Sequence, residues 1–157
     1  MQLFLDKDGV LADFEKHCIT LFGKHPKDLG DTELWRLVNQ DRETFWSTMP
    51  VKDRAYDLVF DITEHDPIVL TGCPRNGDIH HEICPVASSH KKEWVKKNFG
   101  LETITCFARE KPMHMTSLSD VLVDDTYRNV KKWREAGGKA VWYQDYDQAI
   151  ADLKKYI

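Results

Sequence analysis

The sequence has no hydrophobic run that approaches the length needed to cross a membrane. No signal-peptide pattern is present at its start either, so we expect a cytoplasmic protein without a membrane partner. Positive charge is not in excess, because 22 Lys and Arg residues are set against 26 Asp and Glu residues and the net charge is −4. A protein that holds nucleic acid by its phosphate backbone needs a basic face. We therefore expect no stable nucleic-acid partner, while free nucleotides and small phosphoesters remain possible ligands.

Cysteine is also scarce. The four cysteines, Cys18, Cys73, Cys84 and Cys106, are too widely spaced for a disulfide framework and are expected to be reduced thiols. Cys73 and Cys84 enclose His80 and His81 within a dozen residues, a set that could bind zinc. The spacing matches no familiar zinc motif, and the sequence leaves open whether these residues bind a metal.

Short apolar runs that alternate with helical segments are present throughout most of the chain. The length of 157 residues suits one domain with a modest insertion. Strands are expected at residues 3–5, 67–71, 102–107, 120–124 and 139–143, where β-branched and other apolar residues are frequent. Helices are expected from Ser88 or Ser89 to Gly100, at 126–136 and at 147–155. This alternation predicts an α/β fold with a doubly wound, Rossmann-like parallel sheet of about five strands.

The segment between the first two expected strands breaks this rhythm. It contains no convincing strand, only helical stretches at 14–22, 32–39, 42–48 and 55–64. We therefore expect a core domain formed by residues 1–12 and 67–157 and a small helical cap formed by residues 13–66. The cap would follow the carboxyl end of the first strand, where ligands bind in open α/β folds, and act as a lid over the site.

Two aspartates follow the first strand directly. Asp6 and Asp8 are separated by one residue and lead into Gly9. Alternate residues of an extended chain point to opposite faces, so only a kink at Asp8 and Gly9 lets the two carboxylates address one point beyond the strand. That point would suit a metal and a phosphate, although a polar turn is also possible. A calcium loop is disfavoured because residues 10–12 carry no side-chain oxygen.

Polar residues also stand at the ends of other expected strands. Thr71 follows the second, Lys111 lies shortly after the third, and Asp124 with Asp125 follows the fourth. Alone, each could be a cap or a solvated side chain. Together, in this order at one edge of a parallel sheet, they make a set suited to phosphoryl transfer: a nucleophile, cation-binding carboxylates and donors for the phosphate oxygens.

This order of motifs resembles the haloacid dehalogenase (HAD) superfamily of phosphohydrolases. The stretches 8–14, 45–50, 91–100, 109–111 and 120–125 further resemble the 5′(3′)-deoxyribonucleotidase-like branch. The sequence departs from that branch after Thr71, where Gly72-Cys73-Pro74-Arg75 replaces a frequent second hydroxyl, and the loop from Gly72 to His90 is long. These departures concern the substrate more than the chemistry.

The resemblance implies a Mg²⁺-dependent phosphatase, a 5′-nucleotidase-like hydrolase that uses an aspartyl-phosphate intermediate. Asp6 would be the nucleophile and a protonated Asp8 the acid, which later becomes the base. Asp6, the Asp8 carbonyl and Asp124 would hold Mg²⁺, with Asp125 reaching it through water. Thr71, the Gly72 amide and Lys111 would grip the transferred phosphoryl group.

The expected substrate is a small phosphorylated molecule, in particular a nucleoside 5′- or 3′-monophosphate. Phe14 is the best candidate for stacking on a base, and Phe45 and Trp46 could complete a sandwich or form the cap core. Arg75, Lys91 and Arg109 could contact phosphate or sugar or could be solvated. A phosphatase of polynucleotide ends and a non-catalytic nucleotide-binding module are the alternatives, and the sequence leaves the oligomeric state open.

Overall fold

The computed structural model describes all residues from Met1 to Ile157. At its centre lies a five-stranded sheet with strand order β5-β2-β1-β6-β7, in which every neighbouring pair is parallel. The strands are β1 (Leu3–Leu5), β2 (Ile68–Gly72), β5 (Thr103–Cys106), β6 (Val121–Asp124) and β7 (Lys139–Trp142). The predicted α/β fold is confirmed, and β1, which precedes the two aspartates, is the central strand.

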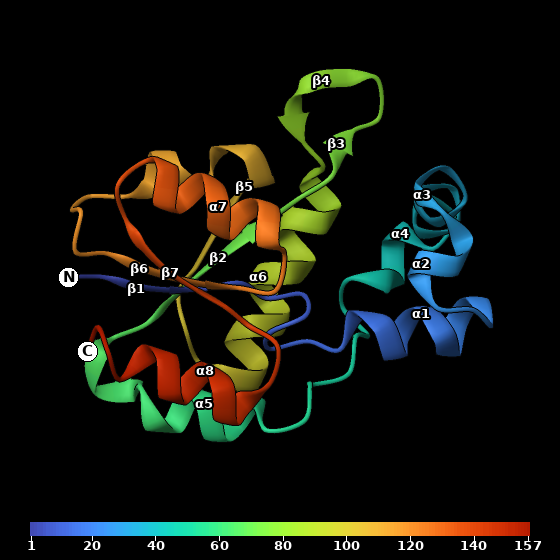
Figure 1. The fold of residues 1–157 in the computed structure, drawn as a ribbon. Coiled ribbons are helices and arrows are strands. Elements are labelled where there is room, and N and C mark those ends of the chain that lie inside the picture. Colours follow the sequence, from blue (N-terminus) through green and yellow to red (C-terminus); the bar gives the residue numbers. More distant parts are fainter.

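Helices cover both faces of the sheet (Figure 1). They are α5 (Ala55–Asp61), α6 (Pro85–Phe99), α7 (Tyr127–Glu135) and α8 (Tyr146–Leu153). Alternate strand residues enter two separate clusters of buried side chains. Leu3 and Leu5 belong to a cluster that includes residues of α5, α6 and α8, whereas Phe4 packs edge-on against Trp133 of α7. Such two-sided burial explains why the strands are almost wholly apolar.

The segment after β1 forms a group of helices beside the carboxyl edge of the sheet (Figure 1). These helices are α1 (Phe14–Phe22), α2 (Pro26–Leu29), α3 (Asp31–Gln40) and α4 (Arg42–Phe45). The chain enters and leaves this group of helices at neighbouring points. The Asp13 amide donates to the Pro50 carbonyl at 2.8 Å, and the Lys52 amide donates to the Leu11 carbonyl at 2.8 Å.

Helix α5, which the sequence places in the expected cap, packs on the core. It contacts α8, and the Tyr146 hydroxyl donates to the Asp61 carboxylate. A 3₁₀ turn, η1 (Thr63–His65), follows and leads into β2. The boundary between core and cap at residue 66 stays a prediction. The helices that lie beside the site, α1 to α4, end at Phe45.

Three local features differ from the sequence-based expectation or add detail to it. The long loop after β2 contains an antiparallel hairpin, β3 (Arg75–Asn76) and β4 (Ile79–Ile83). Helix α6 begins at Pro85 rather than at Ser88 or Ser89, because proline is well suited to the first turn of a helix. Lys111 lies in a 3₁₀ helix, η2 (Ala108–His114), directly after β5. None of the helices is both long and apolar enough to span a bilayer.

Candidate active site

The turn after β1 brings Asp6 and Asp8 to the carboxyl edge of the sheet. The Asp6 amide continues the strand ladder by donating to the Val123 carbonyl at 2.8 Å, and the Lys7 carbonyl accepts the amides of Leu11 and Ala12 at 2.9 Å each. Gly9 has a φ of +85°, and a Cβ there would lie 2.0 Å from Oδ2 of Asp125. Only glycine permits both the backbone conformation and this close approach.

Asp6 shares a buried lysine with Asp124. Lys111 is 1% exposed, and its Nζ lies 2.9 Å from Oδ1 of Asp6 and 2.6 Å from Oδ2 of Asp124. Burial, together with the charges of Asp124 and Asp8, raises the pKa of Asp6 to about 6 although Lys111 opposes the shift. Burial alone would lower the pKa of Lys111, but the two carboxylates outweigh it and raise that pKa. Lys111 is therefore a permanent cation beside the candidate nucleophile.

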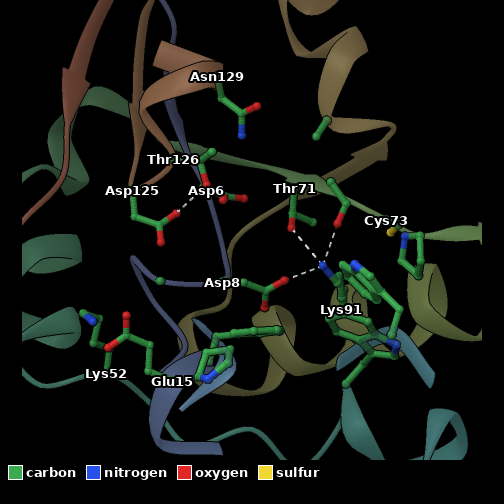
Figure 2. Close-up of a pocket in the computed structure, with 18 of the residues that line it drawn as sticks. Asp6, Asp8, Glu15, Lys52, Thr71, Cys73, Lys91, Asp125, Thr126 and Asn129 are labelled. Atoms are coloured by element: carbon green, nitrogen blue, oxygen red, sulfur yellow. Dashed lines mark hydrogen bonds and ion pairs between the residues drawn. The ribbon is translucent and has the colours of Figure 1, made fainter. Parts of the chain in front are cut away.

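Asp8 lies between two other lysines, and Figure 2 shows the Lys91 ammonium directed at it. Nζ of Lys7 lies 2.9 Å from Oδ1 of Asp8, while Lys91 pairs with Oδ2. Burial opposes ionisation of Asp8, but both ammonium groups outweigh that effect and hold its pKa below the usual range. The sequence-based expectation was a protonated Asp8, whereas the free protein holds this carboxylate ionised.

Lys91 also belongs to the site through its other contacts. Its ammonium donates to the Gly72 carbonyl at 2.6 Å and lies 3.4 Å from the Thr71 hydroxyl at the end of β2. Thr71 is fully buried, and both Thr71 and Gly72 line the same cavity as Asp6. The four residues predicted to carry the chemistry, Asp6, Asp8, Thr71 and Lys111, are therefore brought together.

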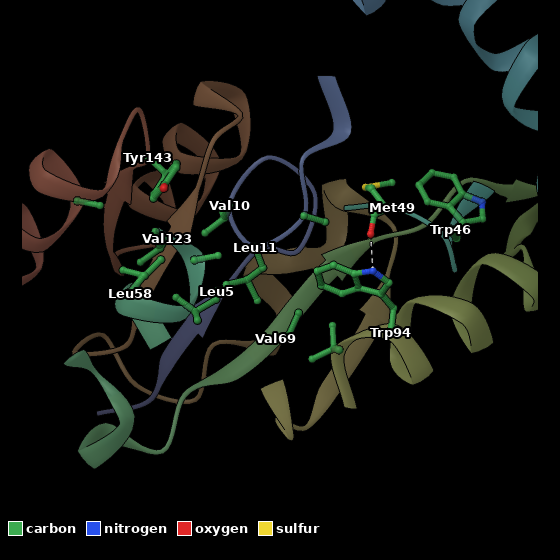
Figure 3. Close-up of a cluster of buried hydrophobic side chains, with 14 of the residues drawn as sticks. Leu5, Val10, Leu11, Trp46, Met49, Leu58, Val69, Trp94, Val123 and Tyr143 are labelled. Carbon is green, nitrogen blue, oxygen red and sulfur yellow. Dashed lines mark hydrogen bonds between the residues drawn. The ribbon is translucent and has the colours of Figure 1, made fainter. Parts of the chain in front are cut away.

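Lys7 is a functional candidate that the sequence analysis missed. It is fully buried and lies 4.4 Å from the centroid of the Trp94 ring, a cation–π contact. Burial lowers the pKa of Lys7, against the influence of Asp8. Figure 3 shows the Trp94 indole N–H directed at the Met49 carbonyl, to which it donates at 2.7 Å. The only sequence signal was a charged residue between two aspartates, two positions after an apolar strand.

Three carboxylates are suitably placed for a metal ion. One oxygen from each of Asp6, Asp124 and Asp125 can be chosen so that all lie within 4.8 Å of one another. Asp124 is fully buried and already accepts hydrogen bonds from Lys111, the Thr126 amide and Asn129. Hard oxygen donors of this kind fit Mg²⁺.

Asp125 is exposed as a residue but faces the cavity (Figure 2). Desolvation by the cavity walls and the charges of Asp6, Asp124 and Asp8 raise the pKa of Asp125 to about 8. These carboxylates repel one another, and a bound cation would relieve that repulsion.

The cavity above these residues has a volume of about 360 Å³ and is open to solvent. Phe14, Trp46 and Lys91 line it, as do residues that the sequence analysis did not select, among them His25, Trp35 and Lys52. Phe45 does not line it. This ring is fully buried in the cap, in edge contact with Phe14 at 5.7 Å and stacked with Phe22 at 5.9 Å between centroids.

The remaining candidates lie elsewhere. Arg75 and Arg109 line a neighbouring cavity rather than the catalytic one. Cys73, His80, His81 and Cys84 do not gather into a group that could hold a metal ion, because His80 and His81 are exposed on β4 while Cys73 is buried. The structure thus provides no zinc site there.

Comparisons of the sequence with protein-family models and with curated proteins find no match. Solved structures do match over almost the whole chain. An uncharacterized protein from Corynebacterium glutamicum is 16% identical with a TM-score of 0.53, and the match covers 99% of this chain and 93% of that one. A hydrolase from Streptococcus pneumoniae is 12% identical with a TM-score of 0.54 and coverage of 98% and 96%.

A haloacid dehalogenase-like family hydrolase from Streptococcus pneumoniae is also 12% identical, with a TM-score of 0.54 and coverage of 99% and 90%. At such identities the likeness concerns the fold. The chain therefore shares the HAD-like fold, and its carboxylates and lysines meet at the carboxyl edge of the sheet, where open α/β folds bind ligands.

Proposed function

We propose that the protein is a Mg²⁺-dependent phosphatase that hydrolyses small phosphomonoesters, with nucleoside 5′- or 3′-monophosphates as the substrate class. The observation that carries this proposal is the environment of Asp6. Its carboxylate faces an open cavity, lies 2.9 Å from the Lys111 ammonium and shares that cavity with the Asp8 carboxylate. A nucleophile, an acid or base and a fixed cation are the parts that phosphoryl transfer requires.

The proposed reaction has two steps. A carboxylate oxygen of Asp6 attacks phosphorus, the bond to the ester oxygen breaks, and the leaving oxygen takes a proton from Asp8. Water then attacks the aspartyl-phosphate, Asp8 accepts its proton, and phosphate departs as Asp6 is restored. The sum is one phosphomonoester and one water converted to an alcohol and phosphate.

The proton for the first step needs a source, because Asp8 is ionised in the free protein. The ammonium groups of Lys7 and Lys91 already donate to the two oxygens of Asp8. We propose that one of them supplies a proton to Asp8 as charge develops on the leaving oxygen, and that the proton taken from water later restores it.

Mg²⁺ would be held by Asp6, Asp124, Asp125 and the Asp8 carbonyl. When bound, the ion would supply positive charge against the phosphate oxygens. Asp125 faces the cavity while the Asp124 oxygens are engaged with Lys111, Asn129 and the Thr126 amide. We therefore assign the direct contact to Asp125 rather than to Asp124, the reverse of the order expected from the sequence.

Aromatic rings near the catalytic carboxylates support a nucleoside as the leaving group. Phe14, Trp35 and Trp46 all line the cavity, and aromatic faces stack on any base. A non-catalytic nucleotide-binding module is the less favoured alternative, because binding a phosphate does not require two carboxylates, Asp6 and Asp8, in the cavity that receives it.

A phosphate-release screen tests the proposal. Nucleoside 5′- and 3′-monophosphates and sugar phosphates are incubated with the wild-type protein and with Asp6→Asn, each with and without Mg²⁺. We expect Mg²⁺-dependent release by the wild type and none by Asp6→Asn, with an unchanged circular dichroism spectrum. Undiminished release by a folded Asp6→Asn protein would refute the aspartyl-phosphate route.

A further inference from the structure

A second cavity adjoins the catalytic one. It has a volume of about 490 Å³ and lies between the end of α3, the start of α4, the β3–β4 hairpin and the segment after β5. Trp35, Cys73 and Pro74 line both cavities. The two cavities therefore adjoin at these residues, and one ligand can contact the lining of both.

The second cavity is strongly basic. Three arginines, Arg42, Arg75 and Arg109, line it, and none of its lining residues is acidic. They come from three separate segments, α4, β3 and η2, in a chain whose net charge is −4. Composition does not explain this gathering of guanidinium groups, whose planar fork of donors matches phosphate oxygens.

The arginines remain available to a ligand. Arg42 and Arg109 have only loose ion pairs, with Glu43 at 3.5 Å and Glu110 at 3.8 Å, and Arg109 also lies 4.5 Å from the Phe107 ring centroid. Arg75 donates to the ring of the exposed His80, and all three arginine side chains are exposed. Trp35, which is 40% exposed, presents its indole at the junction of the two cavities. An aromatic surface between a phosphate-cleaving centre and a guanidinium cluster suits a nucleoside with a phosphate on each side.

We propose that the substrate carries a second phosphate, and that it is a nucleoside 3′,5′-bisphosphate. One phosphate would be hydrolysed at Asp6, while the arginine cluster of Arg42, Arg75 and Arg109 binds the other. One water is consumed, and the products are phosphate and a nucleoside monophosphate. This inference rests on the proposed phosphatase function and narrows its substrate class.

A 5′-phosphorylated oligonucleotide shares this chemistry, because its first phosphodiester occupies the place of the second phosphate. The bisphosphate is favoured because the net charge of the chain is −4, and binding a polynucleotide would need an extended basic surface. The two sources can be separated experimentally.

Kinetics provide the first test. The probes are thymidine 5′-monophosphate, thymidine 3′-monophosphate, thymidine 3′,5′-bisphosphate and the 5′-phosphorylated dinucleotide pTpT, all with Mg²⁺. We expect the wild type to have a kcat/KM at least about tenfold higher for the bisphosphate than for either monophosphate, the value of one charge-assisted hydrogen bond. Arg42→Gln and Arg75→Gln should each reduce this ratio about tenfold. Arg36→Gln is the matched control, since Arg36 lies on α3 but lines neither cavity.

Binding provides the second test and does not depend on turnover. The affinity of Asp6→Asn for thymidine 3′,5′-bisphosphate is measured by calorimetry, alone and combined with Arg42→Gln, Arg75→Gln or Arg36→Gln. We expect the first two additions to weaken binding about tenfold and the third to leave it unchanged.

The outcomes separate the two proposals. If the arginine variants kept the wild-type ratio of kcat/KM between bisphosphate and monophosphate, and the same affinity for the bisphosphate, the second-phosphate site would be overturned. The proposed phosphatase function would be unaffected. Absence of turnover with arginine-dependent binding would overturn the phosphatase and retain the site. A preference for pTpT over the bisphosphate would overturn the bisphosphate assignment in favour of polynucleotide ends.

Discussion

The Lys91 ammonium lies 4.3 Å from the centroid of the Trp46 ring while it pairs with Asp8. Lys91 belongs to α6, whereas Trp46 directly follows α4, the last of the helices inserted beside the site. One turn along α6, Trp94 donates to the carbonyl of Met49, at the end of the same segment. The cap is therefore attached to the helix that carries a charge of the candidate active site.

Lys91 should be essential for catalysis. Lys91→Met removes one of the two cations that hold Asp8 ionised, and we expect kcat to fall about 100-fold or more on every substrate. Lys92→Met is the control, because it removes the same charge from an exposed neighbour on α6. Steady-state kinetics of both variants with a nucleotide and with a small aryl phosphate test this prediction. Equal rates in the two variants would exclude a catalytic role for Lys91.

The pH dependence of stability should report on Asp6. Its pKa is about 6 in the folded protein, against about 3.9 in an unfolded chain, so the folded state binds more protons between these values. Stability of the metal-free protein therefore falls as the pH rises from about 4 to 6. Asp6→Asn removes this loss of stability. It also removes the Asp6 charge that contributes to the raised pKa of Asp125.

Melting temperatures of both proteins across this pH range measure the effect. We expect the wild type to lose roughly 5 to 10 °C relative to Asp6→Asn. Burial lowers the pKa of His17 and favours stability at higher pH, but His17 is present in both proteins and cancels in the difference. Parallel curves for the two proteins would contradict the raised pKa of Asp6.

Mg²⁺ dependence should distinguish the acidic residues. Asp125→Asn removes a carboxylate that faces the cavity, and we expect the Mg²⁺ concentration at half-maximal activity to rise about tenfold or more. Without metal the variant should melt at a higher temperature than the wild type at pH 8, because a repelling carboxylate is gone. Asp147→Asn on the exposed face of α8 is the control. An unchanged Mg²⁺ requirement would show that Asp125 does not bind the ion.

Phe14 should contribute to nucleotide binding. Phe14→Ala removes a ring that lines the catalytic cavity, and stacking worth roughly 1 to 3 kcal/mol corresponds to a KM about five- to a hundredfold higher for a nucleoside monophosphate. A small ester without a base should be little affected.

Phe22→Ala is the matched control for Phe14, because Phe22 also packs on Phe45 but lines neither cavity. The KM values of both variants for both substrates are compared. If the two substitutions have equal effects on both substrates, Phe14 is a packing residue only.

The residues that follow strands were the ones most accessible to prediction. Asp6, Thr71 and Asp124 stand where apolar runs end, and parallel pairing necessarily brings those ends to one edge. Lys7 escaped prediction because an extended chain would direct it away from Asp8. The strand ends at Leu5, however, and the following turn redirects the Lys7 side chain toward Asp8.

Other features carried no local signal at all. The β3–β4 hairpin lacks a regular apolar alternation, since most of its residues are exposed and polar. Arg42, Arg75 and Arg109 are more than 30 residues apart in sequence and meet only through tertiary packing. The sequence left Phe45 between a stacking site and a buried core, because an aromatic residue in a short helix suits both, and the structure shows the buried core.

The central position of β1 has a consequence for biosynthesis. Asp6 is synthesised 118 residues before its neighbour across the sheet, Asp124, and Lys111 bridges the two carboxylates. Contacts so distant in sequence form late and slow folding. A nascent chain therefore carries Asp6 without Lys111 and Asp124 until the segment through Asp124 has emerged from the ribosome. The candidate site can therefore assemble only after β6 has been synthesised.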